Sequence, residues 1–220
     1  GRSAAPQEPP DAKAVQAIRA LTGWQHLEVL PGPALRKAIP ELQVNFGAVA
    51  KGHAADEIAR LLQEKGCTDF LMTIGGETVA VGLNPAGQPW RIGVDAPLYN
   101  TLPGEALLRV VLLGDGGTLS TSGDYRRYRR DTRGRVFSHL IDGRNGRPIT
   151  NTVASVTVAA RDAMTADGLA TALAVLGPEN NFQLLEHYPG VEALLVIRQP
   201  DDSLREIATP DRIPHYIERA

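Results

Sequence analysis

The sequence has few of the features that would assign it quickly to a class of protein. Its only cysteine, Cys67, can form neither an internal disulfide nor a cysteine-based metal cluster. Cys67 precedes an apolar run, and we expect it to pack there as a small hydrophobic residue. The 23 basic and 25 acidic residues nearly balance, and the formal net charge is −2. Without a cationic excess, nucleic-acid binding driven by counter-ion release is not favoured, and any phosphate must be bound locally.

Long hydrophobic runs and internal repeats are also missing. No apolar stretch is long enough to span a bilayer, and the opening GRSAAPQEPP lacks the basic-then-apolar order of a secretory signal. That opening, rich in Pro, Ala and Gln, predicts a flexible linker or cleaved loop over residues 1–10, followed by one domain over residues 11–220. The hydrophobic content of 43% is sufficient for the core of such a domain.

Periodicity and turn residues predict helices and strands in separate runs. Helices are predicted, from apolar residues at helical spacing, over residues 11–21, 53–65, 164–176 and 181–187. Strands bounded by turn residues are predicted at TDFLMTI, TVAVG, WRIGV, LLRVVLL, TLSTS, RVFSHLI, VASVTVAA, EALLVIR and SLREI. Consecutive strands imply antiparallel pairing. The expected fold class is therefore α+β, with antiparallel sheets and packed helices, and not a doubly wound parallel sheet.

The segment NFGAVAKGHAAD, residues 45–56, carries the first candidate site. It is typical of a strand end, a turn at Gly47 and a helix start, with the small Ala48 and Ala50 before Lys51. Backbone N–H groups at a helix N-terminus favour anions, and a lysine beside them adds a full charge. The segment can therefore bind a phosphate, or it can be a plain strand-to-helix connection with an exposed lysine.

The helix predicted over residues 164–176 carries a candidate metal site. At 100° per residue, Asp167 and Thr171 lie about 40° apart on one face, and Leu169 and Leu173 lie roughly opposite them. A carboxylate and a hydroxyl suit a hard cation such as Mg²⁺, which commonly shares its ligand shell with phosphate oxygens. The alternative is a solvated helix face whose threonine bonds back to a carbonyl.

Three further motifs each allow a structural and a functional interpretation. IGGETVAVG joins two strands through Gly75 and Gly76, which make a hairpin turn or let the backbone approach a flat ligand. TSGDY ends a strand with hydroxyls and a glycine, which suit the edge of a ligand. In SHLIDGRNGRP, His139 and Ile141 are expected on one face of a strand, before a turn that starts at Asp142. His139 can act as a general base, although a single histidine in a strand is more often packed and hydrogen-bonded.

Taken together and in this order, the motifs resemble those of the ApbE family of flavin transferases, the FAD:protein FMN transferases. The correspondence extends to LSTSGDY and to the final strand and helix, SVTVAARDAMTADGLATALAVLG. The resemblance implies a two-lobed α+β fold with T-fold-like antiparallel sheets, of which this chain would hold the C-terminal two thirds without the family's N-terminal region. It also implies FAD in a cleft, Mg²⁺ at its pyrophosphate, and transfer of FMN through a phosphoester to a threonine of an acceptor flavoprotein, with release of AMP.

The resemblance also assigns roles to individual residues. The metal ligands would be Asp167, Thr171 and the main-chain oxygen of Ala50. Lys51 would neutralise phosphate charge, and His139 would take the proton of the acceptor threonine. Asp142 would orient the turn beside that histidine. The residues expected to border the nucleotide and the flavin are Gly47, Ala48, Lys51, Gly75, Gly76, Glu77, Thr121, Ser122, Gly123 and His139.

Two other functions fit the same motifs. One is a Mg²⁺-dependent pyrophosphatase that hydrolyses FAD to FMN and AMP, and the other is a non-catalytic FAD-binding or maturation protein. An intact set of Lys51, His139, Asp167 and Thr171 favours an enzyme, because a binder would not require it. From the resemblance alone we expect a lipoprotein of the bacterial periplasm, tethered to the inner membrane through a missing N-terminus, with a companion N-terminal fragment as a further expected partner. The usual aspartate of the family is replaced here by Asn45, which removes a negative charge near the proposed metal.

Overall fold

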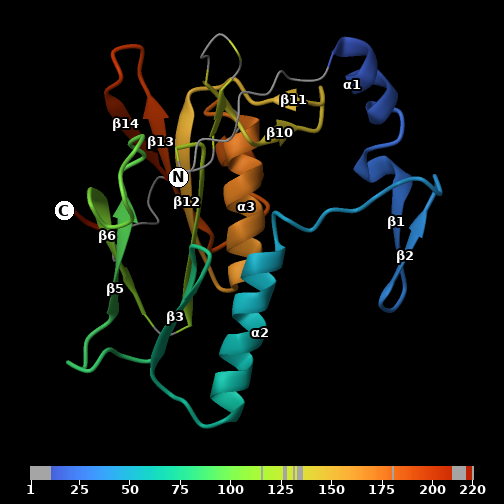
Figure 1. Cartoon of the computed structure of the whole chain (residues 1–220). Helices are drawn as coiled ribbons and strands as arrows, with labels where there is room; N and C mark the ends of the chain where they lie inside the picture. Colours follow the sequence, from blue (N-terminus) through green and yellow to red (C-terminus); the bar gives the residue numbers. More distant parts are fainter. Residues whose placement is uncertain are drawn as a thin grey trace. The chain divides into compact units, whose positions relative to one another are not determined.

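The computed structural model (Figure 1) describes residues 11–114, 116–125, 128–130, 132, 136–179, 181–209 and 217–219. The linker predicted over residues 1–10 lies outside the described residues. The chain divides into two compact units. The larger is drawn from Gly47–Arg127 and Asn151–Ala220, and the smaller from Arg2–Phe46 and Tyr128–Thr150.

A six-stranded antiparallel sheet forms the centre of the larger unit, in the order β14-β13-β12-β7-β4-β3. Its strands are β3 Phe70–Ile74, β4 Glu77–Val81, β7 Gly117–Gly123, β12 Val153–Ala160, β13 Glu192–Arg198 and β14 Leu204–Ala208. A three-stranded antiparallel sheet, ordered β15-β6-β5, contains β5 Trp90–Asp95, β6 Leu107–Leu113 and β15 Ile217–Arg219. The predicted α+β class with antiparallel sheets is confirmed.

The helices of the larger unit are α2 Ala50–Glu64, α3 Ala163–Leu176 and the short α4 Asn181–Leu185. Figure 1 shows α2 and α3 on one side of the six-stranded sheet and β5 and β6 on the other. On the helix side, Ala55 and Ala59 of α2 pack against Val79 and Val81 of β4. On the far side, the core cluster that joins the two sheets consists of Ala80, Val94, Val111, Leu113 and Leu119. Strand alternation therefore buries both faces of β4, as expected for a central layer.

An ion pair ties the central strand of the three-stranded sheet, β6, to the edge strand of the six-stranded sheet, β14. Arg109 of β6 donates from Nε and Nη2 to the two carboxylate oxygens of Glu206 on β14, at 2.7 and 2.9 Å. The two side chains are only 17% and 26% exposed, so water screens the pair weakly.

We expect Arg109→Met to lower the free energy of unfolding by about 1.5–3 kcal/mol, because it leaves a poorly solvated carboxylate without its bidentate donor. Urea unfolding of the purified variant measures this loss. Arg60→Met is the control, since Arg60 is a 58% exposed arginine that also pairs with two glutamates. An equal midpoint shift in both variants would show that the Arg109 pair is no stronger than a surface pair.

The smaller unit consists of short elements. They are α1 Ala12–Arg19, the 3-10 helix η1 Trp24–His26 and the strands β1 Leu27–Leu30, β2 Ala34–Lys37, β8 Tyr128–Arg130, β9 Val136–Ser138, β10 Ile141–Asp142 and β11 Arg147–Pro148. The strands form the antiparallel pairs β1-β2, β8-β9 and β10-β11. Arg19 at the end of α1 donates to the carbonyl of Arg144 at 2.6 Å, which attaches the helix to the β10–β11 turn.

Three predictions about local structure were wrong. The expected strand RVFSHLI is interrupted between β9 and β10, where the N–H of Leu140 donates to Ser138 Oγ at 3.1 Å. His139 therefore lies in a bend and does not share a strand face with Ile141. The helix expected from residue 53 begins at Ala50, which places Lys51 within its first turn. Cys67, expected to be buried, is exposed just after the end of α2.

Candidate functional site

The N-terminal ends of α2 and α3 meet at Gly52 and cap each other. The N–H of Gly52 donates to Asp167 Oδ2 at 3.1 Å. In the other direction, Asp56 of α2 accepts from the N–H groups of Ala163 and Met164 at 2.7 and 2.9 Å. Each helix therefore supplies a carboxylate to the positive N-terminal end of the other, which stabilises both termini.

Only glycine fits at the point where the two helices cross. A Cβ added to Gly52 would lie 2.2 Å from the carbonyl oxygen of Ala163, which belongs to rigid backbone. We therefore expect Gly52→Ala to cost about 2–3 kcal/mol of stability and to separate Lys51 from Asp167.

Gly168→Ala is the matched control for this helix pair. Its added Cβ would meet only the side chain of Val49, at 3.1 Å, and alanine gains up to about 1 kcal/mol of helix propensity over glycine. Thermal unfolding compares the two variants. If Gly52→Ala were as stable as Gly168→Ala, the close crossing would not constrain this position.

The ammonium of Lys51 lies between two buried carboxylates. Its Nζ donates to Glu77 Oε1 at 2.9 Å and to Asp167 Oδ1 at 3.0 Å. The side chains of Glu77 and Asp167 are 2% and 1% exposed, whereas that of Lys51 is 43% exposed. The solvated helix face considered for Asp167 is therefore ruled out, and Lys51 holds its charge at the boundary between protein and solvent.

Lys51 and Glu77 each shift the pKa of the other. Burial alone would lower the pKa of Lys51, but its hydrogen bonds to Glu77 and Asp167 outweigh burial and raise that pKa above the ordinary value. Burial raises the pKa of Glu77, and the hydrogen bond from Lys51 opposes that rise. The ammonium is thus held in its charged form beside the two acidic groups.

Glu77 reaches this position through the glycine turn that precedes β4. Gly75 and Gly76 have φ angles of +61° and +110°, which glycine adopts without strain. A Cβ on Gly75 would lie 3.0 Å from Cδ of Lys51, so the absence of a side chain also lets the lysine cross the turn. Ser120 donates to Glu77 Oε1 at 3.3 Å, and Glu77 Oε2 is buried with no hydrogen-bond partner in the described part of the chain. Glu77 is expected from the sequence to border the nucleotide, but its contact with Lys51 was not predicted, because it depends on the packing of α2 against β4.

The hydroxyl of Thr171 extends the site along α3. Its Oγ1 lies 3.1 Å from Oγ of Ser122 on β7. Ser120 and Ser122 therefore face α3, as strand alternation requires. Thr121 instead pairs with Thr157 across β7 and β12, at 2.9 Å between the hydroxyl oxygens, on the opposite face. The side chains of Ser122 and Thr121 thus point to opposite faces of β7, and the roles of Thr121, Ser122 and Gly123 beside the flavin stay predictions.

His139 and Asp142 belong to the smaller unit, whereas Lys51, Asp167 and Thr171 belong to the larger. His139 is exposed in the bend between β9 and β10. Asp142 is 8% exposed and accepts from the backbone N–H and the guanidinium of Arg144 at 2.9–3.1 Å and from the side-chain amide of Asn145 at 3.2 Å. The hydrogen bonds from Arg144 hold the pKa of the Asp142 carboxyl below its ordinary value. These contacts suit the expected role of orienting the turn.

The oxygen atoms around Lys51 fit a hard divalent cation. Among the residues that the structure describes, no three His, Cys, Asp or Glu residues form a metal-binding group. The carboxylate of Asp167 lies at Lys51 and the hydroxyl of Thr171 follows one turn along α3, whereas the carbonyl of Ala50 as a third donor stays a prediction. Mg²⁺ is commonly held by one or two carboxylates, with waters and substrate phosphates completing its shell. The unpartnered Glu77 Oε2 is consistent with a site that receives a further positive group.

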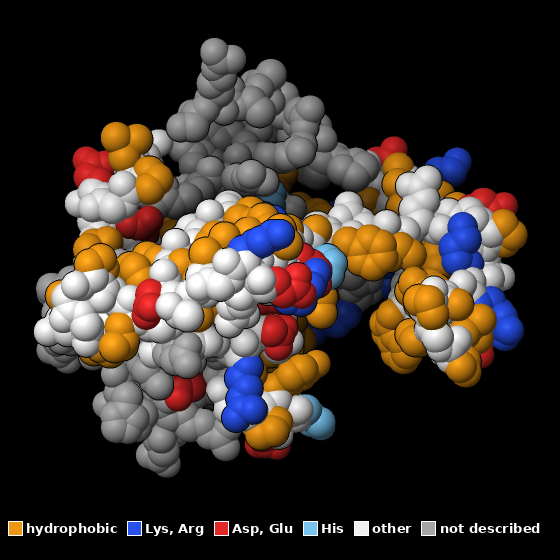
Figure 2. Space-filling view, turned by 90° about the horizontal axis from the view of Figure 1, so that it is seen from below, with side chains coloured by type: hydrophobic (Ala, Val, Ile, Leu, Met, Phe, Trp, Pro, Cys, Tyr) orange, Lys and Arg blue, Asp and Glu red, His pale blue; other side chains and the backbone are white. Residues whose placement is uncertain are grey.

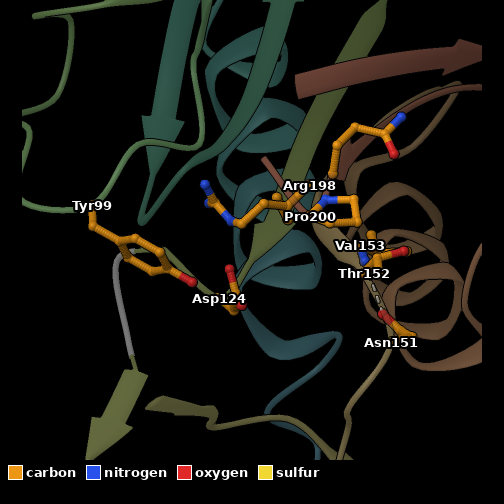
Figure 3. Close-up of a pocket in the computed structure, with 9 residues that line it drawn as sticks. Tyr99, Asp124, Asn151, Thr152, Val153, Arg198 and Pro200 are labelled. Carbon is orange, nitrogen blue, oxygen red and sulfur yellow. Dashed lines mark hydrogen bonds between the residues drawn. The ribbon is translucent and has the colours of Figure 1, made fainter. Parts of the chain in front are cut away.

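A separate pocket of about 300 Å³ lies in the larger unit where β12 begins and β13 ends. In Figure 3 the guanidinium of Arg198 points toward Tyr99, with Asp124 near both. Arg198 lies 4.5 Å from the centroid of the Tyr99 ring and donates to the carbonyl of Pro97 at 2.7 Å. Burial raises the pKa of the Tyr99 phenol. None of the residues predicted for the site lines this pocket.

Charge on the surface is mixed in sign. On the face shown in Figure 2, the described Lys and Arg side chains are interspersed with Asp and Glu, and neither sign forms a continuous patch. This agrees with the near balance of charge in the sequence.

Two helix N-termini, a lysine and two buried carboxylates thus meet beside a glycine turn. The model of the ApbE family matches residues 1–195, and the chain belongs to that family. Curated relatives named FAD:protein FMN transferase are 40% identical over 209 residues in Vibrio cholerae and 38% identical over 197 residues in Klebsiella pneumoniae. These alignments cover 95% and 88% of this chain, and 60% and 55% of the relatives.

The solved structure of the flavin transferase ApbE from Vibrio cholerae is similar to this chain with a TM-score of 0.81 at 39% identity, covering 98% of this chain and 66% of that one. The resemblance deduced from the motifs is therefore confirmed. The chain spans a little more than half the length of the two curated relatives.

Proposed function

We propose that this protein transfers FMN from FAD to a threonine of an acceptor flavoprotein and releases AMP. The observation that carries the proposal is Lys51 held between the buried carboxylates of Glu77 and Asp167, where two helix N-termini meet. The relatives named FAD:protein FMN transferase support it.

The reaction needs positioning and charge neutralisation more than covalent participation by the enzyme. The threonine oxygen forms a bond to the FMN phosphorus while the P–O bond to the bridging oxygen breaks, and that oxygen leaves with AMP. Lys51 would neutralise pyrophosphate oxygens, and His139 would take the threonine proton. Asp167, Thr171 and the Ala50 carbonyl would hold Mg²⁺, which supplies further positive charge to the phosphates.

Hydrolysis of FAD to FMN and AMP is the second candidate. One observation favours it: the lysine, the carboxylates and Thr171 all belong to the larger unit, without any residue of the smaller one. Water in place of the threonine would give this outcome. The third possibility, a non-catalytic FAD-binding or maturation protein, would not require that set of residues.

The location is a further proposal. From the family resemblance we propose a periplasmic lipoprotein. No helix within the described ranges is both long and apolar enough to cross a membrane.

Incubation of the chain with FAD, Mg²⁺ and an acceptor protein that carries the target threonine tests the proposal. We expect the acceptor to gain the mass of FMN less one water, with an equal amount of AMP, and an acceptor with that threonine replaced by valine to gain none. Free FMN with AMP and an unmodified acceptor would show hydrolysis. FAD bound but unchanged would show a binding protein.

A further inference from the structure

We propose that Lys51 acts as a built-in cation that occupies Asp167 until a phosphate arrives, so that divalent-cation binding depends on the nucleotide. Glu77 is the positioning residue that receives the lysine when it leaves Asp167. This inference rests on the proposed function, because it concerns how the same site is loaded.

Both oxygens of Asp167 already have partners. Oδ1 accepts from Lys51 at 3.0 Å, and Oδ2 accepts from the N–H of Gly52 at 3.1 Å. A cation bound to this carboxylate must compete with one of these donors. Gly52 lies in a helix with backbone packed against its Cα, whereas the Lys51 side chain is 43% exposed on a flexible stem. The lysine is therefore the donor that can leave.

Glu77 provides a place for the displaced lysine. Its Oε1 lies 2.9 Å from Nζ of Lys51, and its Oε2 has no partner among the described residues although the side chain is 2% exposed. An ammonium group has three donors, so Lys51 can keep Glu77 while turning another N–H toward a phosphate oxygen. A buried carboxylate oxygen that lacks a donor favours this shift.

The charges determine how the two ligands influence each other. Without a nucleotide, a divalent cation at Asp167 would face the ammonium of Lys51 at close range, and like charges repel in a poorly solvated site. A phosphate attracts the lysine away from Asp167 and cancels part of that repulsion. Phosphate and cation should therefore strengthen each other's binding, and by linkage the coupling must be the same in both directions.

The test measures Mn²⁺ binding to the full chain without nucleotide, by electron paramagnetic resonance of free Mn²⁺. Lys51→Met keeps an unbranched side chain, one heavy atom shorter, but removes the charge, and we expect it to bind Mn²⁺ more tightly by on the order of 10-fold, within the usual range of coupling between sites. The same variant should lose about that factor from the enhancement that AMP gives to Mn²⁺ binding. Lys65→Met, at the exposed C-terminal end of the same helix, should match the parent.

Glu77→Gln provides a second variant with the opposite expected sign. With a neutral partner in place of Glu77, Lys51 relies more on Asp167, so Mn²⁺ should bind more weakly than to the parent. A purely structural ion pair predicts that both variants lose Mn²⁺ binding together. A parallel loss in both variants would therefore overturn the inference. So would unchanged Mn²⁺ binding in Lys51→Met, or the absence of Mn²⁺ binding in every variant. Because the assay contains neither FAD nor acceptor, opposite shifts would support the inference even if FMN transfer failed.

Discussion

Asp167→Asn is expected to lower the rate of FMN transfer by at least about 10³-fold while the protein stays folded. Asparagine keeps the size of the side chain and an oxygen that can accept from the N–H of Gly52. It loses the negative charge that pairs with Lys51 and that would bind a cation. Charge stabilisation by a bound metal is worth several kcal/mol, and each 1.36 kcal/mol changes a rate tenfold.

Alanine would be a poorer test at this position. Asp167 is 1% exposed, so Asp167→Ala would leave the N–H of Gly52 and part of the Lys51 ammonium without an acceptor. Unsatisfied groups of this kind cost about 1–3 kcal/mol each, and lost activity could then reflect unfolding.

The measurement combines the initial rate of transfer, calorimetric titration with Mg²⁺ and FAD, and the thermal midpoint. Asp56→Asn is the control, because Asp56 caps α3 from the other side of the same helix pair without touching Lys51. We expect Asp56→Asn to lose stability but to keep most of its rate. Parental metal affinity in Asp167→Asn would rule out this carboxylate as a metal ligand.

The helical spacing of residues in the sequence was sufficient to predict which side chains α3 contributes to the site. The i, i+4 spacing placed Asp167 and Thr171 on one helix face, and the structure finds Lys51 and Ser122 bonded to them. Helical periodicity is a local property, so sequence alone determines which residues share a face. The start of α2 was missed by three residues because Val49 provides no side-chain cap that would mark it.

Long-range pairing explains what the sequence could not show. Glu77 turns inward because β4 pairs with β7, with Thr78 opposite Leu119, which brings Glu77 to Ser120. Asp56 caps a helix that begins more than a hundred residues further along the chain. Neither contact leaves a local periodic signal, since each depends on how distant elements pack.

The length of the strands explains why the sequence predicts the larger unit better than the smaller one. The strands of the six-stranded sheet are long enough for alternation or burial to appear in the sequence, as in the fully buried β4. The smaller unit has strands of only two to four residues, such as β10 and β11, and turn contacts rather than alternation hold them. The hairpins β1-β2 and β10-β11 were therefore not predicted.

His139→Ala is expected to lose about 10² to 10⁴ in the rate of FMN transfer, the usual contribution of a positioned acid–base group. The structure places His139 exposed in a bend of the smaller unit, so its removal should change stability by no more than about 0.5 kcal/mol. The variant keeps Lys51, Asp167 and Thr171, so FAD should still bind and AMP release without acceptor should persist.

The His139 experiment measures transfer to the acceptor, AMP release without acceptor and the thermal midpoint on one preparation. His187→Ala is the control, because His187 is also exposed and its ring bonds only to the carbonyl of Gln183 within the described part of the chain. A histidine that serves packing alone would lower stability and both activities in parallel. Transfer at the parental rate would rule out His139 as the base. Loss of transfer with retained AMP release would instead separate the two reactions, because water can replace the threonine at the phosphorus without needing this histidine.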